Sequence, residues 1–96
     1  MPSAYILANI SVTNPEQYEE YKKLSTIAMK AHGAEVCVRG GKALVLEGDW
    51  APDRVVLLKF PSAEAAHKFN DSVEYAAARN SRQGAAVMRM TLIEGV

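Results

Sequence analysis

Apolar residues recur with a period of two near both ends of the chain, and this period predicts β-strands. Residues 4–12 place an apolar residue at every second position, and residues 86–94 do so up to position 92. Residues 54–60 differ, because the four positions 55–58 are all apolar. A strand that is apolar on both sides is covered on both sides, so we predict that residues 54–60 lie in the middle of a sheet.

A further strand signal surrounds a pair of glycines. Runs rich in Val and Leu at residues 35–39 and 44–47 flank the glycines at positions 40–41. Glycine reaches positive φ without steric penalty, so we predict a β-hairpin that turns at this pair. The second run ends in an acidic and aromatic corner that contains Glu47 and Trp50.

Polar cap residues followed by apolar steps of three and four predict the helices. Asn14 can cap a helix whose first residue is Pro15, and Gly33 is suited to end it. Ser62 can cap a second helix. Ser72 is another cap signal, so we expect a break near residues 70–71 and a further short helix to about residue 81.

Apart from one further strand in the hairpin and one additional short helix, these elements follow the order β-α-β-β-α-β, which is the ferredoxin-like arrangement. We therefore predict an α+β fold in which the helices cover one face of an antiparallel sheet. No linker, repeat or low-complexity segment interrupts residues 1–96, which we expect to form one domain.

Sorting strand residues by side predicts two unequal faces of the sheet. One set is uniformly apolar, and we assign it to the helices. Its members are Ile6, Ala8, Ile10, Val36, Val38, Leu44, Leu46, Val56, Leu58, Phe60, Met88, Met90 and Leu92. The other set mixes apolar and charged residues. Its members are Tyr5, Leu7, Asn9, Glu35, Arg39, Val45, Glu47, Val55, Leu57, Lys59, Val87, Arg89 and Ile93.

The mixed face is too apolar to face water, and exposed patches on the order of several hundred Å² mark interfaces. We therefore predict a homodimer whose sheets pack face to face. A two-residue turn would place Glu47 on the same side as Val36, so we prefer a three-residue loop or a bulge. A shift of one residue would exchange the faces.

Composition narrows the classes of partner. Eleven basic and eleven acidic residues leave no formal net charge, which argues against nucleic acid. No apolar run approaches the length of about 20 residues that a membrane helix needs, and no leader pattern is present. The single Cys37 cannot form an internal disulfide, and we expect it to be a buried, inert thiol. These features predict a soluble cytoplasmic protein.

Several separated motifs, in order, carry a family resemblance over nearly the whole chain. They are Arg39-Gly40-Gly41, Leu46-Glu47-Gly48-Asp49-Trp50, Phe60-Pro61-Ser62, Ser72-Val73-Glu74-Tyr75, Arg79 and Glu94-Gly95-Val96. With them the chain resembles the small bacterial proteins grouped as domain of unknown function 1330, within the dimeric α+β barrel superfamily. The resemblance implies a ferredoxin-like fold and a dimer whose two sheets form a barrel. It implies no activity, since the superfamily includes cofactor-independent monooxygenases, muconolactone-type isomerases and haem enzymes.

Arg39 and Glu47 lie on strands that the predicted hairpin would pair. As a catalytic pair, Glu47 would act as acid or base with a pKa set by burial and by the guanidinium. As an architectural pair, the same residues would fix the dimer register. Trp50 is a candidate wall of a ligand pocket or a packing plug. His32, at the predicted end of the first helix, is a further catalytic candidate or a solvated cap residue.

Tyr75, Arg79 and Arg82 fall close together on the last predicted helix. Tyr75 and Arg79 are candidates for binding an anionic substrate, since a guanidinium can grip a carboxylate at two points. Equally, they could clamp the C-terminal strand. No spacing of His, Cys, Asp or Glu suggests a metal, and no glycine-rich loop or nucleophile triad suggests a cofactor or covalent chemistry.

Two hypotheses follow from these patterns. In the first, a dimer binds a small organic molecule in a pocket and carries out cofactor-free acid–base, monooxygenase or isomerase chemistry. In the second, the dimer is not an enzyme and its charges are architectural. The sequence leaves open which of these holds.

Overall fold

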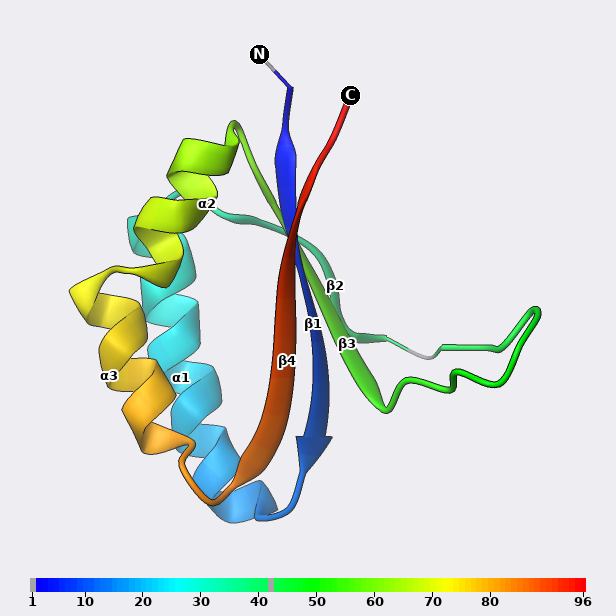
Figure 1. The fold of residues 1–96 in the computed structure, drawn as a ribbon. Helices are drawn as coiled ribbons and strands as arrows, with labels where there is room; N and C mark the ends of the chain where they lie inside the picture. Colours follow the sequence, from blue (N-terminus) through cyan, green and yellow to red (C-terminus); the bar gives the residue numbers. More distant parts are fainter. Residues whose placement is uncertain (1, 42) are drawn as a thin grey trace.

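The computed structural model describes residues 2–41 and 43–96 as a four-stranded sheet with helices along one face (Figure 1). The elements, in chain order, are β1 (Ala4–Val12), α1 (Pro15–Ala31), β2 (Glu35–Gly41), β3 (Arg54–Phe60), α2 (Ala63–Asn70), α3 (Val73–Ser81) and β4 (Ala86–Glu94). The strand order is β2-β3-β1-β4, and every neighbouring pair is antiparallel. This confirms the ferredoxin-like α+β fold, including the central place of residues 54–60.

Each helix begins where its polar cap predicted. The side chain of Asn14 accepts a hydrogen bond from the backbone N–H of Gln17 at 3.2 Å, at the start of α1. Ser62 and Ser72 cap α2 and α3 in the same way. The break between α2 and α3, expected near residues 70–71, is therefore confirmed.

The core lies between the helices and the face of the sheet that they cover. Alternate residues of β1 and β3 are buried there, and Ile10 and Phe60 are both only 1% exposed. Phe69 of α2 and Tyr75 of α3 meet them from the helical side, with their two ring centroids 4.8 Å apart. The sorting of alternate residues by side therefore predicted the buried side of β1 and β3 correctly.

The predicted hairpin around the glycine pair is wrong. Residues 43–53 contain no strand, and β2 pairs with β3 instead. They form an extended segment, here called the arm, that projects away from the sheet (Figure 1). Leu44 and Leu46 are 75% and 98% exposed. β2 is an edge strand of the sheet, and residues 43–53 do not pair with its outer side. Lys42, between β2 and the arm, lies outside the described residues.

A bulge in β2 also places Val38 and Arg39 on the sides of the sheet opposite to those predicted. Val36 is opposite Leu58, but Val38 is opposite Leu57, so Cys37 is the extra residue. One extra residue moves every later side chain to the other side. Val38 therefore lies on the side of Leu57, and Arg39 faces the helices, the reverse of the prediction. Cys37 is exposed and not buried as predicted.

Within the described residues, no helix has both the length and the hydropathy that are needed to cross a membrane.

Candidate functional site

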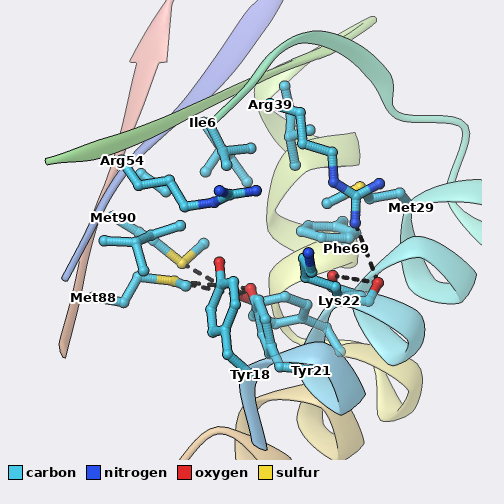
Figure 2. A pocket seen from close by; sticks show the side chains of 16 residues that line it. Ile6, Tyr18, Tyr21, Lys22, Met29, Arg39, Arg54, Phe69, Met88 and Met90 are labelled. Carbon is cyan, nitrogen blue, oxygen red and sulfur yellow. Dashed lines mark hydrogen bonds between the residues drawn. The ribbon is translucent and has the colours of Figure 1, made fainter. Parts of the chain in front are cut away.

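A cavity lies between α1 and the helix-covered face of the sheet (Figure 2). Its free space is about 20 Å³, room for roughly one water molecule. Most of its wall is apolar, with Ile6, Phe69, Met88 and Met90 among the lining residues. The wall also contains polar groups from tyrosine, serine, lysine and arginine side chains. A mostly apolar wall with a small number of polar groups is typical of a small-molecule site.

Two buried tyrosines form one polar point of the cavity. The hydroxyl groups of Tyr21 and Tyr75 lie 2.8 Å apart and are hydrogen-bonded. Tyr75 Oη also lies 3.4 Å from the Met90 sulfur and 3.7 Å from the Met88 sulfur. Burial, and then the neighbouring Tyr75, raise the pKa of Tyr21 above its ordinary value of 10.0. At neutral pH, Tyr21 is therefore a neutral phenol that is able to donate a hydrogen bond, and it is not a base.

Tyr18 and Arg54 form a second polar point, at the β3 side of the cavity. The Arg54 guanidinium carbon lies 5.8 Å from the centre of the Tyr18 ring. Burial raises the pKa of Tyr18, and the positive charge of Arg54 opposes this effect. The Nε of Arg54 is buried and has no hydrogen-bond acceptor among the described residues.

Backbone from β2 passes directly over the Arg54 side chain. Gly40 has φ +72°, and a Cβ added there would lie 2.6 Å from the Arg54 guanidinium carbon. Glycine is the residue that permits both the positive φ and this close approach. Gly40 is therefore explained by the position of Arg54, and not by a hairpin turn.

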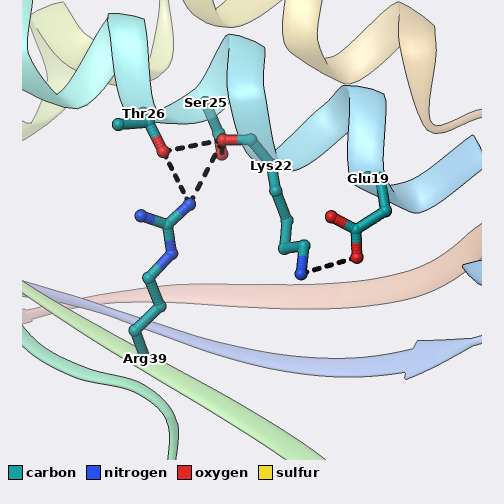
Figure 3. Close-up of polar contacts among 5 residues, drawn as sticks. All are labelled: Glu19, Lys22, Ser25, Thr26 and Arg39. Carbon is teal, nitrogen blue, oxygen red and sulfur yellow. Dashed lines mark hydrogen bonds and ion pairs between the residues drawn. The ribbon is translucent and has the colours of Figure 1, made fainter.

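Arg39 ties β2 to α1 at the mouth of the cavity (Figure 3). Its Nη2 donates to the backbone carbonyl of Lys22 at 3.2 Å and to the hydroxyl of Thr26 at 2.7 Å. The ammonium group of Lys22 pairs with Glu19 at 2.8 Å. Both acceptors of Arg39 are neutral, so its charge is not compensated by these contacts.

The mouth opens into an outer groove along α1. Three cations, Lys22, Arg39 and Arg54, line both the inner cavity and this groove. Lys23 and Glu19 line the groove only. Four basic groups therefore surround one carboxylate here, although the whole chain has no formal net charge.

Of the candidate residues named from the sequence, Arg39 and Tyr75 lie at the cavity. Glu47 and Trp50 lie on the arm, where both are exposed and Trp50 is 62% exposed. The hairpin that was to pair Arg39 with Glu47 is absent, and the hydrogen bonds of Arg39 go to α1 instead. The structure therefore separates the candidates into two groups.

His32 and Arg79 make polar contacts away from the cavity. His32 caps the C-terminal end of α1, and its Nε2 lies 3.1 Å from a Glu74 carboxylate oxygen. Hydrogen bonding to His32 lowers the pKa of Glu74. Arg79 donates to the backbone and side-chain oxygens of Asn70, both at 3.0 Å, and lies over the Tyr75 ring. Arg79 thus joins α3 to the end of α2, rather than to the C-terminal strand.

Sequence reasoning missed Tyr18, Tyr21, Lys22 and Arg54. Tyr18 and Tyr21 belong to the apolar steps of three and four that predict α1, and both are buried, but this pattern alone assigns no role to their hydroxyl groups. Two tyrosines three residues apart on the buried side of a helix bring two hydroxyl groups into the core. Buried hydroxyl groups need hydrogen-bond partners, so this spacing already indicates polar contacts there. For Arg54, the useful signal was a cation at the first residue of the most apolar strand.

No group of three or more His, Cys, Asp or Glu side chains in residues 2–41 and 43–96 is arranged to hold a metal ion. The cavity described here is lined instead by phenol, guanidinium and thioether groups.

Comparisons with known proteins agree with the fold and leave the chemistry open. The family model described as a domain of unknown function, DUF1330, matches residues 3–96. No curated protein matches the chain. A protein of unknown function from Rhodopseudomonas palustris has a similar structure, with 24% sequence identity and a TM-score of 0.76, over 99% of this chain and 83% of that one.

Two further solved structures share the fold at lower identity. SnoaB from Streptomyces nogalater, described as a cofactor-independent oxygenase, has 10% identity and a TM-score of 0.66, over 97% of this chain and 92% of that one. A dimeric ferredoxin-like protein of unknown function from Thermobifida fusca has 14% identity and a TM-score of 0.60, over 94% of this chain and 90% of that one. Likeness at these identities extends to the fold alone.

Proposed function

Because the chain belongs to the DUF1330 family, which is described only as a domain of unknown function, we propose a function from the cavity: the protein binds a small organic molecule between α1 and the sheet. The observation that carries this proposal is the set of polar groups in an otherwise apolar wall. Tyr18, Tyr21 and Ser25 are all buried, yet each brings a hydroxyl group to the cavity. Burying a hydroxyl group is costly unless it has a partner. Tyr21 and Ser25 have partners within the protein, at the Tyr75 hydroxyl and the Lys22 carbonyl. In this proposal, a ligand takes the place of these partners at the cavity wall.

The same groups support cofactor-free chemistry on the bound molecule. A neutral phenol placed in a water-poor cavity stabilises negative charge that develops on a substrate oxygen, as in an enolate. Tyr21 and Tyr75 are suited to this role because each can turn its hydroxyl from the other toward a ligand. The likeness of fold to a cofactor-independent oxygenase is compatible with this chemistry.

A homodimer is the second part of the proposal. The face of the sheet without helices carries Leu7 and Leu57 near its centre, and Val87 and Ile93 are 61% and 44% exposed. The arm adds Leu46 and other exposed apolar residues. A second copy that covers this face would remove the apolar residues of the face and of the arm from water. A solved structure of the same fold is described as dimeric.

In this dimer, Glu47 and Trp50 are exposed on the arm and lie where they can meet the partner subunit. We propose that any catalytic or ligand contact of Glu47 or Trp50 is made from the arm in the assembled dimer. His32 and Arg79 have positioning roles in the same proposal, since each already holds a neighbour outside the cavity.

The alternative function is a dimer without enzymatic activity, in which the charges are architectural. One observation favours it: the hydrogen bonds of Arg39 to Lys22 and Thr26 join β2 to α1 whether or not a ligand is present.

A thermal-shift screen of small organic molecules distinguishes the two functions. The test variant Ala8→Leu adds apolar volume to the cavity wall, and Ala77→Leu makes the same change on the exposed side of α3. Compounds that stabilise the wild type and Ala77→Leu, but not Ala8→Leu, are expected. Stabilisation that persists in Ala8→Leu would place binding elsewhere, and a screen without hits would favour the architectural alternative.

A further inference from the structure

Resting on the cavity site proposed above, we infer that Arg39 and Arg54 form an anion-binding mouth and that the natural ligand is a small organic acid. Its carboxylate would lie at the two guanidinium groups, and its apolar body would point inward toward Tyr18 and Tyr21. Arg39 comes from β2 and Arg54 from the neighbouring β3, and both side chains extend to the cavity (Figure 2).

The first support is the absence of a paired carboxylate at either arginine within residues 2–41 and 43–96. The hydrogen bonds of Arg39 go to a carbonyl and a hydroxyl group. The Nε of Arg54 is buried without an acceptor. A partly buried guanidinium normally pairs with a carboxylate, since removal of a charge from water is costly. This cost applies to Arg54, which is half-buried, whereas Arg39 is exposed. An anionic ligand would supply the missing partner of Arg54, with the charge of Arg39 beside it.

The second support is the local excess of positive charge. Lys22, Lys23, Arg39 and Arg54 share the outer groove with one acidic residue, Glu19. Glu19 is already engaged by Lys22 at 2.8 Å. The groove therefore attracts anions toward the cavity, while the chain as a whole has no formal net charge.

The third support is the way in which Arg54 is held in place. The backbone at Gly40 lies against one side of its guanidinium, and the Tyr18 ring lies 5.8 Å from the guanidinium carbon. A guanidinium fixed between two surfaces loses little conformational freedom when it binds. Its planar set of donors matches the two oxygens of a carboxylate, which a lysine cannot do.

The shape of the site limits the body of the ligand. The free space inside is about 20 Å³, so a ring or short chain enters only as neighbouring side chains move aside. Met88 and Met90 line this space, and the flexible methionine side chain adapts readily to a new neighbour. The ligand class is therefore a monocarboxylic acid with a small apolar or aromatic body.

The test compares carboxylates with their uncharged amides. Calorimetry with acetate, benzoate and phenylacetate, and with the three corresponding amides, measures how much the charge contributes at constant shape. For the wild type, at least one carboxylate should bind about tenfold or more tightly than its amide. Arg54→Gln and Arg39→Gln should reduce this ratio to near one, and Arg54→Lys should retain only part of it.

Lys30→Gln is the matched control, because it removes one positive charge at an exposed position of α1 outside the groove. It should leave the ratio unchanged, and urea unfolding of each variant checks that the fold is intact. Amides that bind as well as carboxylates would overturn the anion site and leave the cavity proposal standing, provided that Ala8→Leu blocks them. If no carboxylate binds to the wild type, the anion inference is wrong.

Discussion

The helix-covered face of the sheet and the arm both carry large apolar side chains, but the environments of these side chains are opposite. On the covered face, Ile10 and Phe60 are each 1% exposed, whereas on the arm Leu46 is 98% exposed and Trp50 is 62% exposed. Apolar composition is therefore not sufficient for burial, because a segment also needs a complementary surface within reach. The covered face finds this surface in the chain's own helices, and we propose that the arm finds it in a second copy.

The polar candidate residues are also divided between these two regions. On the covered side of the sheet, the hydroxyl groups of Tyr21 and Tyr75 are hydrogen-bonded to each other, and Arg39 is hydrogen-bonded to α1. On the arm, Glu47 is exposed. The site on the covered face is thus organised within one subunit, and any role for Glu47 depends on assembly.

The largest expected effect is the loss of an aromatic ring from the covered face. Phe69 is 0% exposed and stacks against Phe60 and Tyr75, so Phe69→Ala should lower the free energy of unfolding by about 3 to 5 kcal/mol. Urea denaturation measures this change. Val73→Ala, at a position 83% exposed on α3, should change it by less than about 0.5 kcal/mol. A small effect of Phe69→Ala would contradict the assignment of the core.

Substitutions on the arm should weaken the association of two subunits rather than the folding of one. Leu46→Asp places a charge where we propose that the partner subunit packs, and it should raise the dimer dissociation constant about tenfold or more. Sedimentation equilibrium measures the dissociation constant. Val73→Asp introduces the same charge at an exposed apolar position away from the arm and should have no effect. A wild type that stays monomeric at micromolar concentration would exclude this role of the arm.

The two regions can be compared through two glycines with positive φ. Gly40 has φ +72° and lies against the Arg54 guanidinium, whereas Gly48 of the arm has φ +87° and no atom within 4 Å of an added Cβ. Alanine at either position should cost about 1 kcal/mol from backbone strain. Gly40→Ala should cost more than Gly48→Ala, because it also displaces Arg54. Equal losses of unfolding free energy would mean that Arg54 moves aside freely.

The smallest expected effect is a change in pH dependence. Burial raises the pKa of Tyr21 above 10.0, so above pH 10 the unfolded chain releases a proton that the folded chain retains. Stability from this group is therefore present below pH 10 and is lost as the pH rises. The urea midpoint of Tyr21→Phe, measured from pH 8 to pH 11, should fall less steeply than that of the wild type. Parallel curves would show that Tyr21 ionises readily in the folded protein.

Local sequence signals were sufficient for much of the fold. The caps at Asn14, Ser62 and Ser72 predicted where the helices begin. The sorting of alternate strand residues by side predicted the buried sides of β1 and β3. The hairpin was wrong because a turn signal at two glycines does not determine whether the next apolar run pairs, and residues 43–53 leave the outer edge of β2 unpaired.

The candidate site was harder to predict, since its residues meet only through tertiary contacts. The faces of Val38 and Arg39 depend on the one-residue bulge at Cys37, which has no local signature. Tyr21 meets Tyr75 across 54 positions of sequence, and each alone is consistent with an ordinary core residue.

A crystal structure of the protein with benzoate bound, or with whatever acid is retained from the cells, would show directly where the ligand lies. The expected result is a carboxylate at Arg39 and Arg54, with the ring directed toward Tyr18 and Tyr21. Ligand density confined to the arm beside Glu47 and Trp50, with the space beneath α1 still closed, would contradict it.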